Sequence, residues 1–183
     1  MSKRSRLALL VTASVLVVAG ACRGAPADLP ADATPSGDLA LLVRLGDLAR
    51  QRVQQIEPGA TLQQIDVLPG DGRYEFRFSD PTLARAVLAS GAAGARTPEA
   101  FTLTPGAQLA GAPGAPIELG GLRIGPDGVV AAAVQELSAA SPRSLVLARQ
   151  DGRLVWRVVV NGPQGIVSGT VPDDTGRFVR DAP

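Results

Sequence analysis

The sequence predicts an α+β fold made of two tandem units, each a helix packed on an antiparallel β-sheet. In residues 38–105, apolar residues recur at helical spacing and then give way to alternating strand patterns. Residues 117–183 repeat the same order of patterns. Between the two units, residues 106–116 are rich in Gly, Ala and Pro, which is typical of a linker.

The chain begins with a pattern typical of an export signal. Three basic residues precede an uncharged, mostly apolar run over residues 7–19, and small residues follow it (the basic residues are Lys3, Arg4 and Arg6). The run is shorter than the roughly 20 apolar residues that a membrane-spanning helix needs. Residues 1–21 are therefore predicted to be a signal peptide.

The end of this signal resembles the lipobox of bacterial lipoproteins. Ala19-Gly20-Ala21 places small side chains before Cys22, which is the only cysteine of the chain. The resemblance implies cleavage between Ala21 and Cys22, and attachment of a thioether-linked diacylglycerol and an N-acyl chain to Cys22. Several acyl chains hold a protein on a bilayer, because each buried methylene contributes about 0.8 kcal/mol. The alternatives are an ordinary secretory signal cut near Ala21 and an uncleaved anchor.

Residues 22–37 are predicted to be a disordered tether between the lipid and the folded part. They are rich in Ala, Pro, Asp and Gly, and they show no periodic apolar pattern. Such a composition is typical of a linker that prolines keep partly extended.

In the first unit, residues 38–105, a helix is predicted from Asp38 to the Pro58-Gly59 stop signal. Its apolar stripe is Leu42, Leu45, Ala49, Val53 and Ile56. Gly46 interrupts this helix at a cost of about 1 kcal/mol relative to alanine, which indicates close packing there. Strands are predicted over 61–68 and 73–78, with a turn between them, followed by a short helix over 80–91 and a short strand over 99–104.

In the second unit, residues 117–183, a lead-in strand over 117–124 is expected to precede a helix. That helix begins at Pro126 and has the apolar stripe Val130, Ala133, Val134 and Leu137. Strands are predicted over 144–149, 154–160, 166–171 and 177–180, with an Asp-Gly hairpin signal at Asp151-Gly152.

The second unit resembles a PepSY domain. The resemblance rests on the middle strand Leu154-Val155-Trp156-Arg157-Val158 and on the turn Asp173-Asp174-Thr175-Gly176 before the last strand. It covers about residues 126–180, and a degenerate copy without the Thr-Gly turn covers about 38–90. It implies a cystatin-like fold, one helix on an antiparallel sheet, in an envelope protein that binds or restrains protein partners without catalytic residues.

Composition excludes several classes of site. The chain has no histidine and no cysteine after Cys22, so disulfides, Ser-His-Asp catalysis and the commonest zinc, copper and iron sites are excluded. Once the signal is removed, fifteen basic residues face seventeen acidic ones, which provides no electrostatic basis for nucleic-acid binding. No cofactor and no metal site are predicted.

Three groups of residues are candidates for a functional role. Trp156 is expected in the core of the second unit, with a partner interface as the alternative. Asp173 and Asp174 are better explained by turn chemistry than by calcium binding. Arg73, Glu75 and Arg77 alternate with aromatic residues and form a charged stripe on the outer face of a strand. A solvated surface is the favoured explanation of this stripe, which is nonetheless the best candidate for a specific partner contact.

Together these patterns predict a lipid-anchored, non-enzymatic envelope protein that binds or restrains a protein partner, such as a secreted protease or wall enzyme. The predicted location is the cell membrane or the outer membrane, with the folded part facing the periplasm or the exterior. A structural envelope scaffold and a carrier of a small apolar or lipidic ligand are the alternatives. No two acidic residues are framed by aromatic residues as in a glycosidase cleft, so an enzyme is not expected.

Overall fold

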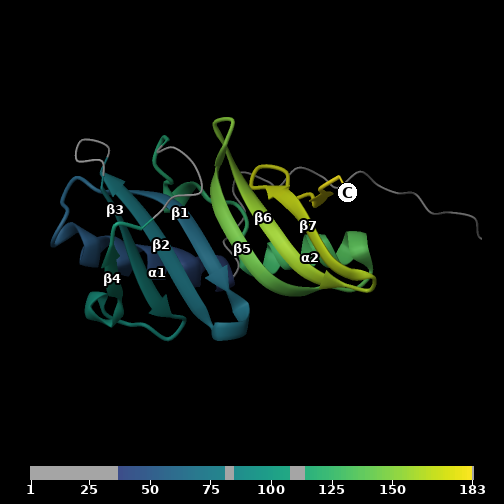
Figure 1. Cartoon of the computed structure of the whole chain (residues 1–183), viewed down its shortest axis with the longest axis horizontal. Helices are drawn as coiled ribbons and strands as arrows, with labels where there is room; N and C mark the ends of the chain where they lie inside the picture. The colour runs from purple at the N-terminus through teal and green to yellow at the C-terminus, as the bar shows by residue number, and fades with distance from the viewer. Residues whose placement is uncertain (1–36, 81–84, 108–113, 183) are drawn as a thin grey trace, which may run out of the picture.

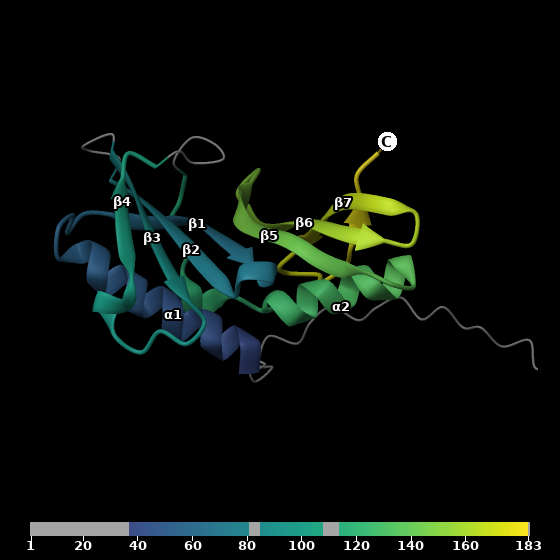
Figure 2. The ribbon, with the colours of Figure 1, turned by 60° about the horizontal axis from the view of Figure 1, so that its bottom comes forward.

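The structure is a computed structural model that describes residues 37–80, 85–107 and 114–182. The predicted signal peptide, the cleavage site at Ala21 and Cys22, and the predicted tether up to residue 36 lie outside these residues. The described chain forms one eight-stranded antiparallel sheet with the strand order β4-β3-β2-β1-β5-β6-β7-β8 (Figure 1). Both helices lie against the same face of this sheet (Figure 2).

The elements follow one another in the order helix, then strands, twice along the chain. The first half contains α1 (Gly37–Gln54), β1 (Thr61–Leu68), η1 (Pro69–Asp71), β2 (Arg73–Asp80), β3 (Arg85–Ala92), η2 (Pro98–Ala100) and β4 (Thr102–Pro105). The second half contains η3 (Leu119–Gly121), α2 (Pro126–Leu137), β5 (Ser141–Gln150), β6 (Arg153–Gly162), β7 (Gly165–Pro172) and β8 (Val179–Arg180).

The predicted fold class was wrong, because the two halves share one sheet and are not tandem helix-on-sheet units. β1 pairs with β5 in antiparallel register, from Gln64 opposite Ala148 to Val67 opposite Leu145. This pairing satisfies backbone groups at two strand edges that separate units would leave open to other chains. The pairing also places Ile65 beside Leu147 in a continuous core, where both side chains are fully buried.

Two local predictions were also wrong. The helix predicted over 80–91 is absent from the described part of that range, since β2 runs to Asp80 and β3 occupies Arg85–Ala92. Val87 and Ala89 are buried at the spacing of a strand, and this alternation outweighs the helix-start signal at Asp80-Pro81. The expected lead-in strand over 117–124 is replaced by η3 and extended chain, with Ile117 N–H donating to the Leu62 carbonyl at 2.8 Å.

The helices bury the faces that pack on the sheet. Four residues of the predicted α1 stripe are buried (Leu42, Leu45, Ala49 and Val53), whereas Ile56 lies beyond the helix and is 53% exposed. Gly46 is the site of close packing, because an added Cβ would lie 2.5 Å from Leu119 Cδ1. In α2 the buried residues are Pro126, Val129 and Ala133. Of the predicted stripe only Ala133 is therefore buried, whereas Val130, Val134 and Leu137 are half-buried.

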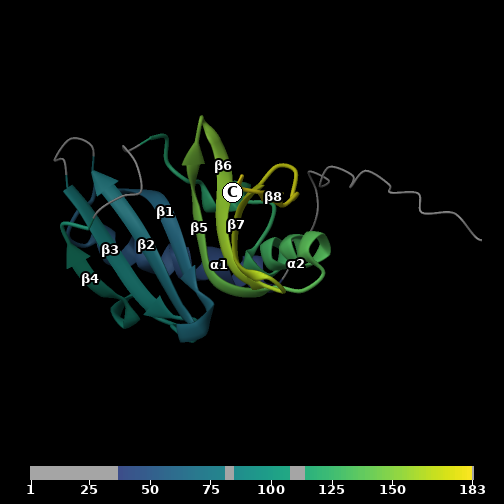
Figure 3. The same ribbon diagram turned by 45° about the vertical axis from the view of Figure 1, so that its right-hand side comes forward.

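Aromatic side chains of both halves lie in the same core. Phe76 and Phe78 of β2 and Trp156 of β6 are fully buried, which confirms the predicted core position of Trp156. β8 is a two-residue strand that pairs with β7 at one end of the sheet (Figure 3). Among residues 37–80, 85–107 and 114–182, no helix is long and apolar enough to cross a membrane.

Acidic side chains hold the segment that leads into α2. Asp38 of α1 accepts a hydrogen bond from the Asp127 N–H at 2.7 Å, in the first turn of α2. Gly125 is required at this contact, because a Cβ there would lie 2.3 Å from Asp38 Oδ2. From the other half, the Asp173 carboxylate accepts the backbone N–H groups of Arg123 and Ile124 at 3.1 to 3.2 Å. The start of α2 is thus fixed by both halves of the chain.

Candidate functional site

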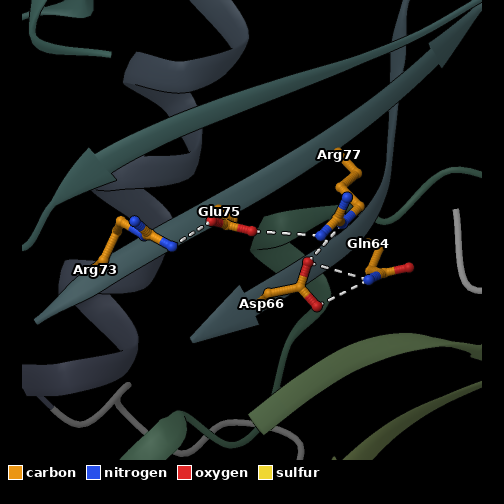
Figure 4. Close-up of polar contacts among 5 residues, drawn as sticks. All are labelled: Gln64, Asp66, Arg73, Glu75 and Arg77. Carbon is orange, nitrogen blue, oxygen red and sulfur yellow. Dashed lines mark hydrogen bonds and ion pairs between the residues drawn. The ribbon is translucent and has the colours of Figure 1, made fainter. Parts of the chain in front are cut away.

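The charged stripe predicted on β2 is part of a polar network on the sheet face opposite the helices. Alternation along β2 places its aromatic side chains in the core and Arg73, Glu75 and Arg77 on the other face. The register of the β1–β2 hairpin brings Asp66 opposite Glu75 and Gln64 opposite Arg77. Figure 4 shows these five side chains pointing toward one another.

Glu75 and Asp66 each lie between two donors in this network. The Glu75 carboxylate pairs with Arg73 Nη2 at 3.0 Å and with Arg77 Nη2 at 3.3 Å. The Asp66 carboxylate accepts from Arg77 Nε at 2.7 Å and from Gln64 Nε2 at 2.8 and 3.0 Å (Figure 4). Two arginines and two carboxylates therefore neutralise one another.

Most of this network is screened from solvent. The side chains of Glu75 and Arg77 are only 12% and 21% exposed, whereas that of Arg73 is 48% exposed. Partly buried charges with several charge-assisted hydrogen bonds contribute more to stability than solvated pairs do. The arrangement therefore stabilises the hairpin, and Arg73 is the member most accessible to another molecule. A partner contact at Arg73, Glu75 and Arg77 stays a prediction.

Sequence reasoning missed the contribution of Asp66 and Gln64, although a signal was present. Both residues alternate with Ile65 and Val67 on β1, and the turn over residues 69–72 joins β1 directly to β2. Pairing the two strands across that turn places Asp66 beside the charged stripe.

A second candidate site is an open groove along α1, with a volume of about 520 Å³. One side is α1 from Leu39 to Gln51, and the other is the segment 119–122 that contains η3. The apolar residues that line it are Leu39, Ala40, Val43, Leu48, Leu119 and Leu122. We call this feature the α1 groove. The sequence did not predict it, because residues 119–122 were assigned to a strand.

Polar side chains line the rim of the α1 groove. Arg44, Asp47 and Gln51 follow one another along α1 at intervals of about one helical turn. Arg44 Nη1 donates to the Ala95 carbonyl at 2.6 Å, which fixes the position of its guanidinium. Asp47 lies 3.9 Å from Arg50, and its side chain is 52% exposed. The groove thus combines an apolar floor with opposite charges on its rim.

The turn after β7 has a structural role. Asp173 is 5% exposed, and burial raises the pKa of its carboxyl, although the N–H groups of Ile124 and Arg123 oppose this shift. Asp174 instead pairs with Arg153, and this hydrogen bond lowers the pKa of Asp174. The two carboxylates therefore serve different contacts. In the described part of the chain, no three acidic or sulfur-bearing residues are grouped as a metal site requires.

The predicted cleavage and lipidation site at Ala21 and Cys22 lies outside the described residues, so the structure places no side chain there. Tyr74, at the end of the aromatic face of β2, is half-buried. Burial raises the pKa of its hydroxyl, and the negative charges of Asp127 and Asp38 add to this effect. Tyr74 is therefore a neutral hydroxyl beside the start of α2.

The fold resembles that of a solved structure, described as a putative lipoprotein from Clostridium difficile. The similarity covers 70% of this chain and 86% of that one, with a TM-score of 0.54 and 9% sequence identity. At this identity the comparison shows a shared fold alone. Neither a protein-family model nor a curated protein matches the chain. The resemblance to PepSY domains therefore stays a prediction.

Proposed function

We propose that this chain is a lipid-anchored, non-enzymatic protein of the bacterial cell envelope that binds or restrains a protein partner. The observation that carries the anchor is the sequence Ala19-Gly20-Ala21-Cys22 at the end of a cationic and apolar leader. The fold shared with the Clostridium difficile protein supports this assignment, because that protein is itself described as a putative lipoprotein.

Partner binding is supported by the α1 groove. Its apolar floor is open to solvent over several residues, and exposed apolar grooves with polar rims are typical of protein interaction sites. The polar network on β2 is a weaker candidate, since its carboxylates are already paired with its arginines. We therefore place the principal partner contact on α1. The PepSY resemblance fits a role in protein binding and is part of this proposal.

A carrier of a lipidic ligand is the less favoured function. Sites for small apolar ligands bury most of the ligand surface. The α1 groove is open along one side, so an acyl chain lying in it would stay partly in water. A partner helix, which is about 10–12 Å across with its side chains, covers more of such a groove than a single acyl chain does.

The anchor is tested by the variant Cys22→Ser in cells that produce the full chain. The wild-type protein is expected to sediment with membranes, to enter the detergent phase on extraction and to be labelled by radioactive palmitate. Cys22→Ser is expected to lose the label and the acyl chains, because serine has no thiol to form the thioether. Ser14→Ala, a small substitution within the leader, is the control and should behave as wild type. An unchanged label in Cys22→Ser contradicts the proposed anchor.

A further inference from the structure

We infer that the α1 groove binds an amphipathic helix of a partner protein, and that this helix lies in the layer next to the membrane. The inference deepens the proposed function, and its membrane position rests on the anchor at Cys22. The binding mode itself rests on the shape and the charges of the groove alone.

The length of the groove fits a short helix. The part of α1 that lines it runs from Leu39 to Gln51, which corresponds to about 18 Å at 1.5 Å per residue. A partner helix of about twelve residues, or three turns, covers this length. Helices that bind in apolar grooves do so with side chains at positions i, i+3 or i+4, and i+7. Gly120 has no side chain, and nothing lies within 4 Å of its Cβ position, so a partner backbone can approach closely there.

The charges on the rim specify the partner further. Arg44 and Asp47 lie about one turn apart on α1 and carry opposite charges. A helix in the groove therefore gains most when an acidic residue faces Arg44 and a basic residue faces Asp47. The order of these two charges also sets the direction of the partner helix. Because the charges of Arg44 and Asp47 cancel, the rim offers no net attraction to an anionic lipid surface, so it fits a protein better than a membrane.

The position of the groove limits where the partner helix can be. Residues 23–36 connect Cys22 to Gly37, the first residue of α1. Fourteen residues span at most about 50 Å in any conformation. Because the first turns of α1 line the groove, a lipid on Cys22 keeps the groove within roughly this distance of the bilayer. The partner helix must then belong to a protein that is exposed in this membrane-proximal layer.

The test is a library of helical peptides of about twelve residues, displayed on phage and selected on the purified full chain in lipid nanodiscs. The library carries aliphatic residues at i, i+3, i+4 and i+7 and all charge combinations beside them. Selection is expected to enrich peptides with one acidic and one basic residue at the spacing of Arg44 and Asp47. Ala40→Glu places a carboxylate on the apolar floor, and it should weaken binding of the enriched peptide by about tenfold or more. Asp47→Lys should enrich an acidic residue where the wild type enriches a basic one.

Ala131→Glu is the matched control, because Ala131 is an exposed alanine on the other helix, α2. It should leave peptide binding unchanged, and all three variants should keep the melting temperature of the wild type. Absence of an enriched amphipathic peptide overturns the inference. Equal binding to Ala40→Glu and the wild type also overturns it, as does lipid co-purifying in the groove or a dimer that Ala40→Glu abolishes.

A photo-crosslinking amino acid at position 40, in intact cells of the source bacterium, tests the membrane position. The expected crosslink is to a predicted amphipathic helix of an envelope protein that the enriched peptide displaces. A crosslink to a protein far from the membrane, or one that the peptide does not displace, contradicts this part. If Cys22 carries no lipid, the proposed anchor fails while peptide binding is still measured on the same protein. The two proposals therefore fail separately.

Discussion

Removing the Asp66 carboxylate tests whether the polar network on β1 and β2 stabilises the fold. Asp66 is 7% exposed and accepts hydrogen bonds from Gln64 and from Arg77 at 2.7 Å. In Asp66→Ala, each donor loses one buried acceptor, which costs about 1–3 kcal/mol for a neutral donor. The loss at Arg77 is expected to be only about 1 kcal/mol, well below the 3–5 kcal/mol typical of a broken buried ion pair, because its side chain is 21% exposed and keeps Glu75 at 3.3 Å. Together we expect a loss of about 2–4 kcal/mol in the free energy of unfolding.

The assay is urea unfolding monitored by tryptophan fluorescence, since Trp156 is the only tryptophan and is fully buried. Arg73→Ala is the matched control, because Arg73 is 48% exposed and forms an ion pair with Glu75 only at the edge of the network. It should cost less than about 1 kcal/mol, as exposed pairs do. If Asp66→Ala costs no more than Arg73→Ala, the network is a solvated surface and the reasoning is refuted.

Two further predictions concern other contacts of the fold. Burial raises the pKa of Asp173, so the folded state binds more protons than the unfolded state between the ordinary pKa of aspartic acid and the raised value. The wild type should therefore lose stability, relative to Asp173→Asn, as the pH rises through this interval. Urea unfolding at a series of pH values measures this change. A difference in the free energy of unfolding that stays constant with pH contradicts the prediction. In Gly169→Ala the new Cβ would lie 2.4 Å from the Phe178 ring and 2.6 Å from the Val179 carbonyl oxygen. This variant should unfold about 1–3 kcal/mol more easily, whereas Gly94→Ala, which meets nothing within 4 Å, should not; equal melting curves for the two would show that β8 does not pack as described.

Local patterns predicted much of the secondary structure. The apolar stripe from Leu42 to Val53 and the alternation from Arg73 to Phe78 reflect burial on one side of a helix and of a strand. Such periodicity depends only on neighbours in the chain, so a single sequence reveals it. The close packing at Gly46 could also be predicted, because a glycine within a helix is costly without a reason.

Features that depend on distant residues could not be predicted in this way. The pairing of Ile65 with Leu147 joins the two halves into one sheet. The sequence patterns of β1 and β5 are equally compatible with edge strands of two separate sheets. Residues 85–91 follow a helix-start signal at Asp80-Pro81, but the pairing of β3 with β2 decided their structure. The α1 groove depends on where Leu119 and Leu122 pack, which local spacing does not reveal.

The charged stripe was also predictable only in part. Alternation predicted that Arg73, Glu75 and Arg77 share one face of a strand, and the structure places them together. The partial burial of Glu75 and Arg77 could not be predicted, because it arises from neighbouring strands on the same face. A charged pattern in a sequence therefore identifies a face, whereas the pairing across strands decides whether that face is free to bind.

The mass of the intact protein, purified from membranes of its source organism, tests the account most directly. Our account predicts a chain that starts at the sole sulfhydryl-bearing residue, Cys22, and is heavier than the polypeptide by a diacylglyceryl group and one fatty acyl group. A mass equal to that of an unmodified chain, with or without residues 1–21, would contradict it.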